Sequence, residues 1–260
     1  MPPNQNAEIA KTRSEITPVY RWSIVGLLCL GMMIAYFDRV NLSVVLALPE
    51  FKSTFQLTDQ DRGALNSAFF WSYAALQIPA GWFVDKLGVK FPFAAGLLIW
   101  SLISAGTAFA GGVRQLFTLR LLLGLGESVV TPAGLRWIRF NCAENQRGLA
   151  VGLYMAAAKV GPAVGTPLAT FLMIHYGWRN MFVILGVGCL VWLIPWLLLV
   201  KNNDREIEKA IVKQSAAPPV AFTRVIASPV IWGTVIGTFC YQYFVYFCMT
   251  WMPAYFVERR

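Results

Sequence analysis

The composition of this 260-residue chain is that of a membrane protein, because 57% of its residues are hydrophobic and only 13% are charged. Soluble domains carry about 25% charged residues, so an ordinary soluble enzyme or binding domain is excluded. The net charge is +9, but the basic residues lie at the ends of apolar runs, which disfavours nucleic-acid binding. The five cysteines form no CxxC pair and there is one histidine, so we expect no disulfide framework, no metal site and no cofactor.

Seven apolar stretches are long enough to cross the membrane as helices, which takes about 20 residues each. The first is too long for a signal-peptide core, so we expect it to remain as a spanning helix. We predict an all-α, polytopic membrane protein. Lys and Arg predominate on the side of the N-terminal tail, which places the N-terminus in the cytoplasm. We expect the protein to lie in the inner (plasma) membrane. The predicted spans are residues 22–46, 63–84, 91–110, 115–133, 148–174, 180–200 and 228–257.

The longest polar stretch, residues 201–219, separates six of these spans from the seventh. It is charged and ends in SAAPP, the composition of a linker. Six helices, a linker and a new block resemble the two-half architecture of secondary transporters. We therefore expect the chain to be the N-terminal portion of a longer protein that functions as a monomer. The predicted regions are a cytoplasmic tail (1–21), a six-helix bundle (22–200), a cytoplasmic linker (201–227) and the first helix of a second bundle (228–260).

Several ionisable residues lie inside the predicted spans. Asp38 and Arg39 follow an apolar run, Arg120 and Glu127 lie in the fourth span, and Lys159 lies in the middle of the fifth. A charge at membrane depth costs about 3 kcal/mol and persists where it faces a polar cavity and finds a partner. Arg120 and Glu127 are seven residues apart and share one helix face. This pattern predicts a path for a charged solute or a proton through the bundle.

The segment GWFVDKLGVK, residues 81–90, resembles the signature loop GxxxD(R/K)xGx(R/K) of the major facilitator superfamily. It also lies where that family has it, between the second and third spans. The resemblance implies a six-helix bundle of that superfamily followed by the first helix of the second bundle. It further implies that the loop acts as a conformational latch formed by Gly81, Asp85, Lys86, Gly88 and Lys90.

Two further spans carry glycine motifs. RLLLGLGE, residues 120–127, resembles the family's RxxxGxG motif. The fifth span holds Gly148 with Gly152 and Gly161 with Gly165, two GxxxG spacings that let helices approach closely. The Gly161-Pro162 element resembles part of the family's fifth-span motif, but the full antiporter pattern is missing, which disfavours an antiporter.

Four short segments together look like the anion:cation symporter family: YFDRVN (36–41), QIPAGW (77–82), GWRNMF (177–182) and TWMPAY (250–255). That family includes bacterial sugar-acid and phthalate permeases, sialin and the vesicular glutamate transporters. The resemblance implies import of an organic anion, such as a hexonate, hexarate or hexuronate, together with a cation by alternating access. The cation is usually H⁺ in bacterial members, and Na⁺ stays open as an alternative.

The resemblance assigns candidate roles to the buried charges. Asp38 and Glu127 are the candidate proton-coupling groups, with Arg120 adjusting Glu127. Arg39 is the candidate ligand for the substrate carboxylate, since its planar guanidinium binds carboxylates through two hydrogen bonds. The alternatives are a static pair of Arg120 with Glu127 and a salt bridge of Arg39 with Asp38.

Tyr36, Tyr73 and Gln242 match positions that line the sugar-acid site of the resembling permeases, so we expect them to contact substrate hydroxyls. Plain packing is the alternative for the tyrosines. Lys159 either adds positive charge to the cavity for a more anionic substrate or pairs with Glu127 or Asp38.

Three rival functions remain. A transporter-like sensor or scaffold without transport activity is favoured by the shortness of the chain. A drug-type antiporter is disfavoured because Arg39, Arg120 and Lys159 would repel a cationic drug. An enzyme is disfavoured because the sequence has no GxSxG motif, P-loop or dinucleotide fingerprint.

Overall fold

The computed structural model describes residues 17–201 and 222–259. The chain divides into two units, residues 1–212 and 213–260, and each is described by itself. The described residues form helices and short connections without strands, which confirms the predicted all-α class. Most of the predicted tail and linker, residues 1–16 and 202–221, lie outside the described residues.

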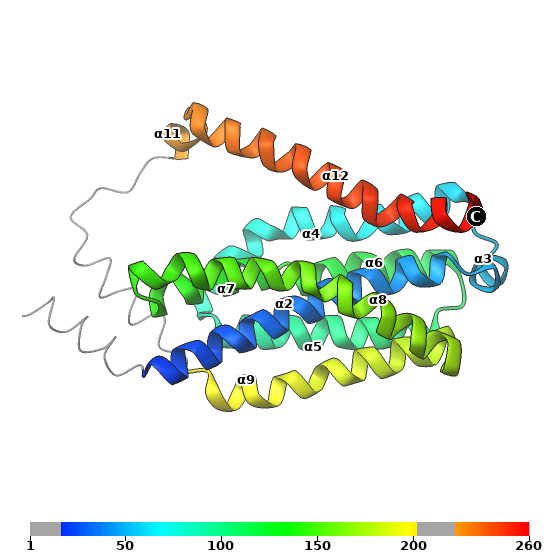
Figure 1. Cartoon of the computed structure of the whole chain (residues 1–260), viewed down its shortest axis with the longest axis horizontal. Helices are drawn as coiled ribbons and strands as arrows, with labels where there is room; N and C mark the ends of the chain where they lie inside the picture. Colours follow the sequence, from blue (N-terminus) through cyan, green and yellow to red (C-terminus); the bar gives the residue numbers. More distant parts are fainter. Residues whose placement is uncertain (1–16, 202–221, 260) are drawn as a thin grey trace, which may run out of the picture. The chain divides into compact units, whose positions relative to one another are not determined.

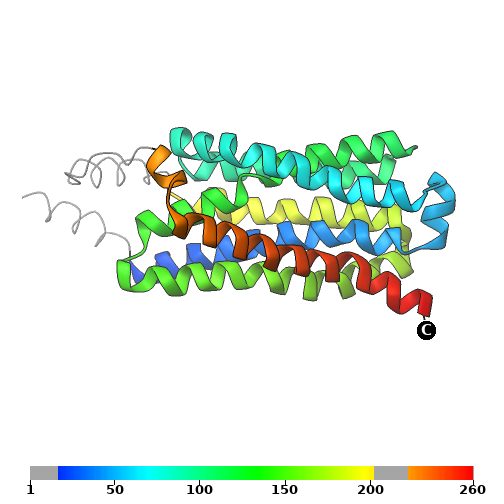
Figure 2. The same ribbon diagram turned by 90° about the horizontal axis from the view of Figure 1, so that it is seen from above.

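The first unit is a bundle of long helices that run side by side (Figures 1 and 2). The second unit holds a short helix, α11 (Phe222–Ile226), and a long one, α12 (Pro229–Arg259). The helices of the first unit are, in chain order, α2 (Pro18–Leu46), α3 (Pro49–Phe55), α4 (Asp59–Leu87), α5 (Lys90–Gly106), the 3₁₀ turn η1 (Thr107–Phe109), α6 (Val113–Glu127), α7 (Val130–Asn141), α8 (Glu144–Cys189), the 3₁₀ turn η2 (Leu190–Trp192) and α9 (Leu193–Leu199).

Helix α8 contains the fifth predicted span and the start of the sixth, because the chain reverses inside it. Gly177 has φ +79° and ψ 160°, a backbone conformation that glycine adopts without steric cost. From this turn the chain runs back through η2 and α9 along the bundle (Figure 1).

Five helical segments of the described residues are long and apolar enough to cross a membrane, and six of the seven predicted spans overlap them. The exception is 63–84, which lies within α4. Polar residues such as Asn66, Ser72 and Gln77 lower its mean hydropathy. The five segments are Pro18–Leu46, Lys90–Phe109, Val113–Asn141, Glu144–Leu199 and Pro229–Cys248.

Local sequence signals fix the ends of α4. Thr58 caps its first turn: the Thr58 hydroxyl accepts a hydrogen bond from the Asp61 amide at 3.1 Å, and the Asp61 carboxylate accepts one from the Thr58 amide at 2.9 Å. This reciprocal capping box satisfies two amides that have no partner within the helix. At the other end Gly88, with φ +83°, stops the helix. The turn places the predicted latch loop between α4 and α5.

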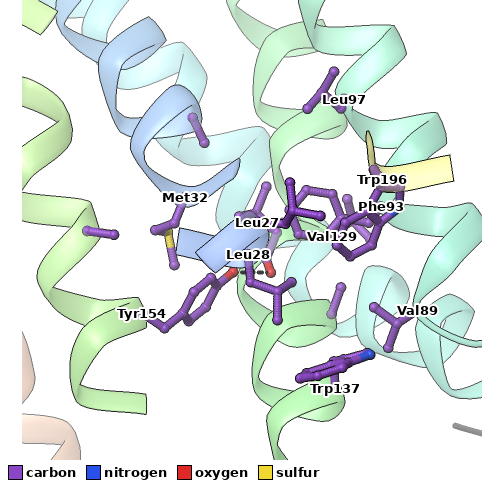
Figure 3. Packing of buried hydrophobic residues seen from close by; sticks show 14 of the residues in the cluster. Leu27, Leu28, Met32, Val89, Phe93, Leu97, Val129, Trp137, Tyr154 and Trp196 are labelled. Carbon is purple, nitrogen blue, oxygen red and sulfur yellow. Dashed lines mark hydrogen bonds between the residues drawn. The ribbon is translucent and has the colours of Figure 1, made fainter. Parts of the chain in front are cut away.

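An aromatic and aliphatic core joins α2, α5, α7, α8 and α9 (Figure 3). Phe93 lies 4.8 Å from Trp196 and 5.1 Å from Trp192, ring centre to ring centre. The Tyr154 hydroxyl donates to the Val130 carbonyl at 2.7 Å. Because lipid tails are as apolar as these side chains, packing and hydrogen bonds rather than water exclusion hold such helices together.

Glycines set how closely the helices approach. A Cβ added at Gly161 would lie 2.6 Å from the Met33 carbonyl oxygen of α2, and one added at Gly165 would clash with the Phe37 ring of α2. The GxxxG prediction is therefore confirmed for this pair. For Gly148 and Gly152 the prediction stays untested: apart from the nearby α8 backbone, no atom of the described residues lies within 4 Å of an added Cβ.

The two glycines of the RxxxGxG motif have the same effect on α6. An added Cβ at Gly124 would lie 2.5 Å from the Phe69 carbonyl of α4, and one at Gly126 would lie 3.0 Å from the Trp100 amide of α5. The motif thus lets α4 and α5 pack closely against α6, immediately before Glu127.

Candidate functional site

The centre of the candidate site is an ion pair between α2 and α6. Arg39 Nε donates a hydrogen bond to Glu127 Oε2 at 2.7 Å, and the two side chains are 7% and 0% exposed. The N⁺–H···O⁻ distance is that of a strong charge-assisted hydrogen bond. The close approach of α6 to its neighbours at Gly124 and Gly126 holds Glu127 at the end of its helix.

Aromatic rings surround the guanidinium of Arg39. Its Cζ lies 4.1 Å from the ring centre of Tyr36, 4.6 Å from that of Tyr73 and 5.0 Å from that of Phe69. The ring faces attract a cation and lower the cost of burying it. The Tyr73 hydroxyl shares a hydrogen bond of 3.2 Å with Thr131 Oγ1. The structure therefore brings Tyr36 and Tyr73 together around the buried guanidinium of Arg39.

Asp38 accepts its hydrogen bonds from neutral side chains. Its Oδ1 accepts hydrogen bonds from Asn41 Nδ2 and from Ser104 Oγ, each at 3.0 Å, and the residue is 2% exposed. Among the described residues nothing donates a hydrogen bond to Oδ2. The two buried carboxylates thus differ: Glu127 has a cationic partner, whereas Asp38 has an amide and a hydroxyl.

Arg120 is buried on α6 and interacts electrostatically with both Glu127 and Asp38. As alternatives to transport roles, the sequence suggested a static pair of Arg120 with Glu127 and a salt bridge of Arg39 with Asp38. In the structure the hydrogen-bonded ion pair joins Arg39 to Glu127. The interior of the bundle thus holds two carboxylates and two guanidinium groups close to one another, those of Asp38, Glu127, Arg39 and Arg120.

Two further predicted site residues lie on α8 and α12. Lys159 is exposed on α8. Gln242 is half-buried in α12 of the second unit.

The predicted latch loop contains a second ion pair. Asp85, at the end of α4, accepts a short hydrogen bond from Arg136 of α7, whose side chain is 7% exposed. Lys86 Nζ lies 4.8 Å above the ring of Trp82, and the Lys90 carbonyl accepts from the Trp196 indole at 2.9 Å. Gly88 makes the turn between the two helices, whereas no atom of the described residues lies within 4 Å of an added Cβ at Gly81.

Sequence reasoning missed three residues of these clusters. Asn41 lies three residues after Asp38 and therefore on the same helix face, a spacing that signals contact. Ser104 and Arg136 reach their carboxylates from other helices, and the sequence carries no signal for those contacts.

Comparisons with known proteins now decide the family. The profile described as Major Facilitator Superfamily matches residues 28–260. The chain belongs to the major facilitator superfamily. The predicted family and bundle architecture are therefore confirmed, and the chain is part of a multi-pass membrane transporter family.

Curated relatives of the chain are named as anion transporters. The probable sulfoacetate transporter SauU of Cupriavidus necator is 32% identical over 253 residues, which cover 92% of this chain and 58% of that protein. The hexuronate transporter of Bacillus subtilis is 26% identical over 241 residues, covering 91% of this chain and 57% of that protein. This chain thus spans less than two-thirds of the length of these relatives.

A solved structure shares the fold. It is a bacterial homologue of the human lysosomal transporter Spinster, in an inward-facing and unoccupied conformation, with a TM-score of 0.74 and 21% identity over 91% of this chain and 55% of that one.

Proposed function

We propose that the protein to which this chain belongs imports an organic anion, a sugar acid or related carboxylate, together with protons by alternating access. The observation that carries the proposal is the buried Arg39–Glu127 pair, in which the guanidinium is framed by Tyr36 and Tyr73. The relatives named as transporters of sulfoacetate and hexuronate support an anionic substrate.

Charge balance at Arg39 couples the anion to the proton. While Glu127 is ionised it occupies the guanidinium that a substrate carboxylate would bind. A proton on Glu127 neutralises that carboxylate, and the substrate carboxylate then takes its place at Arg39. The net charge of the site is unchanged by the exchange, so the loaded site carries no extra buried charge into the transition between outward-open and inward-open states.

Asp38 is the second proposed proton-coupling group. Both donors that hold it, Asn41 and Ser104, bond to Oδ1, so Oδ2 is the oxygen that accepts a proton. Arg120 then provides the positive charge that both carboxylates share. A sodium ion is the second candidate at this position, because Asp38 Oδ2 and Asn41 Oδ1 are buried acceptors to which no described residue donates.

Four further residues shape specificity in this proposal. Hydroxyl groups of Tyr36 and Tyr73, with the amide of Gln242, contact the substrate hydroxyls, and Lys159 adds positive charge for a more anionic substrate. The ion pair of Asp85 with Arg136 serves as the latch that holds one state. The N-terminus lies in the cytoplasm and the membrane is the plasma membrane.

The test uses proteoliposomes that contain the protein expressed from its complete coding sequence. Glu127→Gln should abolish accumulation of a labelled hexuronate driven by a pH gradient, yet retain exchange of labelled for unlabelled substrate. Glu50→Gln, an exposed glutamate of α3, is the matched control and should behave as the wild type. If Glu127→Gln still accumulates substrate in response to the pH gradient, Glu127 is not the proton-coupling group. If accumulation in the wild type requires Na⁺ instead of a pH gradient, the coupling ion is Na⁺.

A further inference from the structure

A groove of about 400 Å³ lies between α4, α5 and the junction of α6 with α7, apart from the Arg39–Glu127 site. The only hydroxyl among its lining residues belongs to Ser128, which donates to the Leu125 carbonyl at 2.8 Å. Every other lining side chain is apolar or glycine. The groove therefore suits a hydrocarbon chain. Its principal walls are Leu76, Pro79, Phe83, Phe91, Ile99 and Leu125.

The groove opens on the surface of the bundle. Phe83 is 49% exposed, Phe91 is 57% exposed and Ile99 is 39% exposed in the described chain. In a bilayer such a surface meets hydrocarbon rather than water. Ala95 and Gly96 line the groove. Because their side chains are small, the surface is hollowed there, whereas larger side chains would fill the hollow.

Two lysines lie next to one end of the groove in the sequence. Leu87 and Phe91 line that end, and each is directly preceded by a lysine, Lys86 and Lys90. The neighbouring carboxylate, Asp85, is paired with Arg136. The loop beside the groove thus contributes two lysines, of which Lys86 has its Nζ 4.8 Å above the Trp82 ring. Their charge is complementary to an anionic headgroup.

We propose that this groove binds one acyl chain of an anionic phospholipid, with the lipid phosphate at Lys86 and Lys90. A basic pocket between transmembrane helices at the membrane surface is a setting in which anionic headgroups bind. Because the lysines and the groove belong to the latch loop and to the helices that it joins, a bound lipid would bridge α4 and α5. The proposal does not depend on the transported substrate.

The test is native mass spectrometry of the detergent-solubilised protein, expressed from its complete coding sequence and titrated with phosphatidylglycerol or phosphatidylcholine. Phosphatidylglycerol should bind the wild type about tenfold more tightly than phosphatidylcholine, and Lys86→Gln with Lys90→Gln should remove that preference. Lys52→Gln, on α3, is the charge control and should keep it.

A second variant tests the acyl chain. Ala95→Trp fills the groove and should weaken binding of phosphatidylglycerol about tenfold, whereas Leu198→Trp, at a 79% exposed position on α9, should not. If Ala95→Trp is not monodisperse, Ala95→Leu replaces it. Equal binding of the two lipids by the wild type, unchanged preference in the double lysine variant, or unchanged affinity in the Ala95 variant would each overturn the proposal.

Discussion

Removing either partner of the Arg39–Glu127 pair should destabilise the bundle, and removing both should cost less than the sum of the single changes. Arg39→Met leaves the Glu127 carboxylate, which is 0% exposed, without its cation. Breaking a buried pair in this way costs about 3–5 kcal/mol. Glu127→Gln keeps an oxygen that accepts from Arg39 Nε, and the aromatic rings around the guanidinium remain, so its cost should be about 1–3 kcal/mol.

The coupling between the two positions follows from the geometry. Unit charges about 4 Å apart attract by about 4 kcal/mol at an effective dielectric constant near 20. The cost of removing both groups from water offsets part of this attraction. With a direct hydrogen bond of 2.7 Å between them, we expect a coupling free energy of about 2–3 kcal/mol.

The assay is a double-mutant cycle on the free energy of unfolding, from titration of mixed micelles with sodium dodecyl sulfate and readout by tryptophan fluorescence. Arg39→Met, Glu127→Gln and the double variant are compared with the wild type. Arg62→Met with Asp59→Asn is the control cycle at a surface pair, since the Asp59 side chain is 88% exposed. That control should show a coupling of about 0–1 kcal/mol. Additive effects at Arg39 and Glu127 would refute the reasoning that they form one unit.

Two further predictions concern the latch and the helix contacts. Asp85→Asn should destabilise the bundle by about 1–2 kcal/mol, because the Arg136 side chain is 7% exposed while that of Asp85 is 67% exposed. The same titration with sodium dodecyl sulfate measures this change. A loss of stability no larger than that of Asp59→Asn would contradict the prediction. Gly124→Val should cost about 3 kcal/mol or more because α4 must move away from α6, whereas Gly152→Val should cost less than about 1 kcal/mol. Size-exclusion profiles check this pair, and a monodisperse, normally stable Gly124→Val variant would show that the two helices do not need the close contact.

The helices were largely predictable because length and apolarity determine them. The turn between the fifth and sixth spans coincides with Gly177, which the sequence had placed between those spans. The span in α4 was also predicted from its length and apolarity, although its polar residues lower its mean hydropathy. Uniform apolarity does not show which helix faces touch: the described residues place a neighbouring helix against Gly161 and Gly165 but none against Gly148 and Gly152.

The sequence predicted which charged residues lie in the site better than it predicted which of them pair with one another. The cost of burying a charge singled out Asp38, Arg39, Arg120 and Glu127, and all four lie buried or nearly so in the structure. Which carboxylate Arg39 contacts depends on the rotation of α2 against α6, a tertiary property that no local pattern encodes. Ser104 illustrates the same limit, since a serine in an apolar helix gives no signal of the carboxylate that it will face.

The central claim is that an organic anion and protons move together through the site that contains Arg39 and Glu127. The most direct measurement loads proteoliposomes, containing the protein from its complete coding sequence, with a pH-sensitive dye and adds hexuronate outside. The account predicts acidification of the lumen on addition of substrate, absent in Glu127→Gln and present in Glu50→Gln. Entry of labelled hexuronate into wild-type proteoliposomes without any change in internal pH would contradict it.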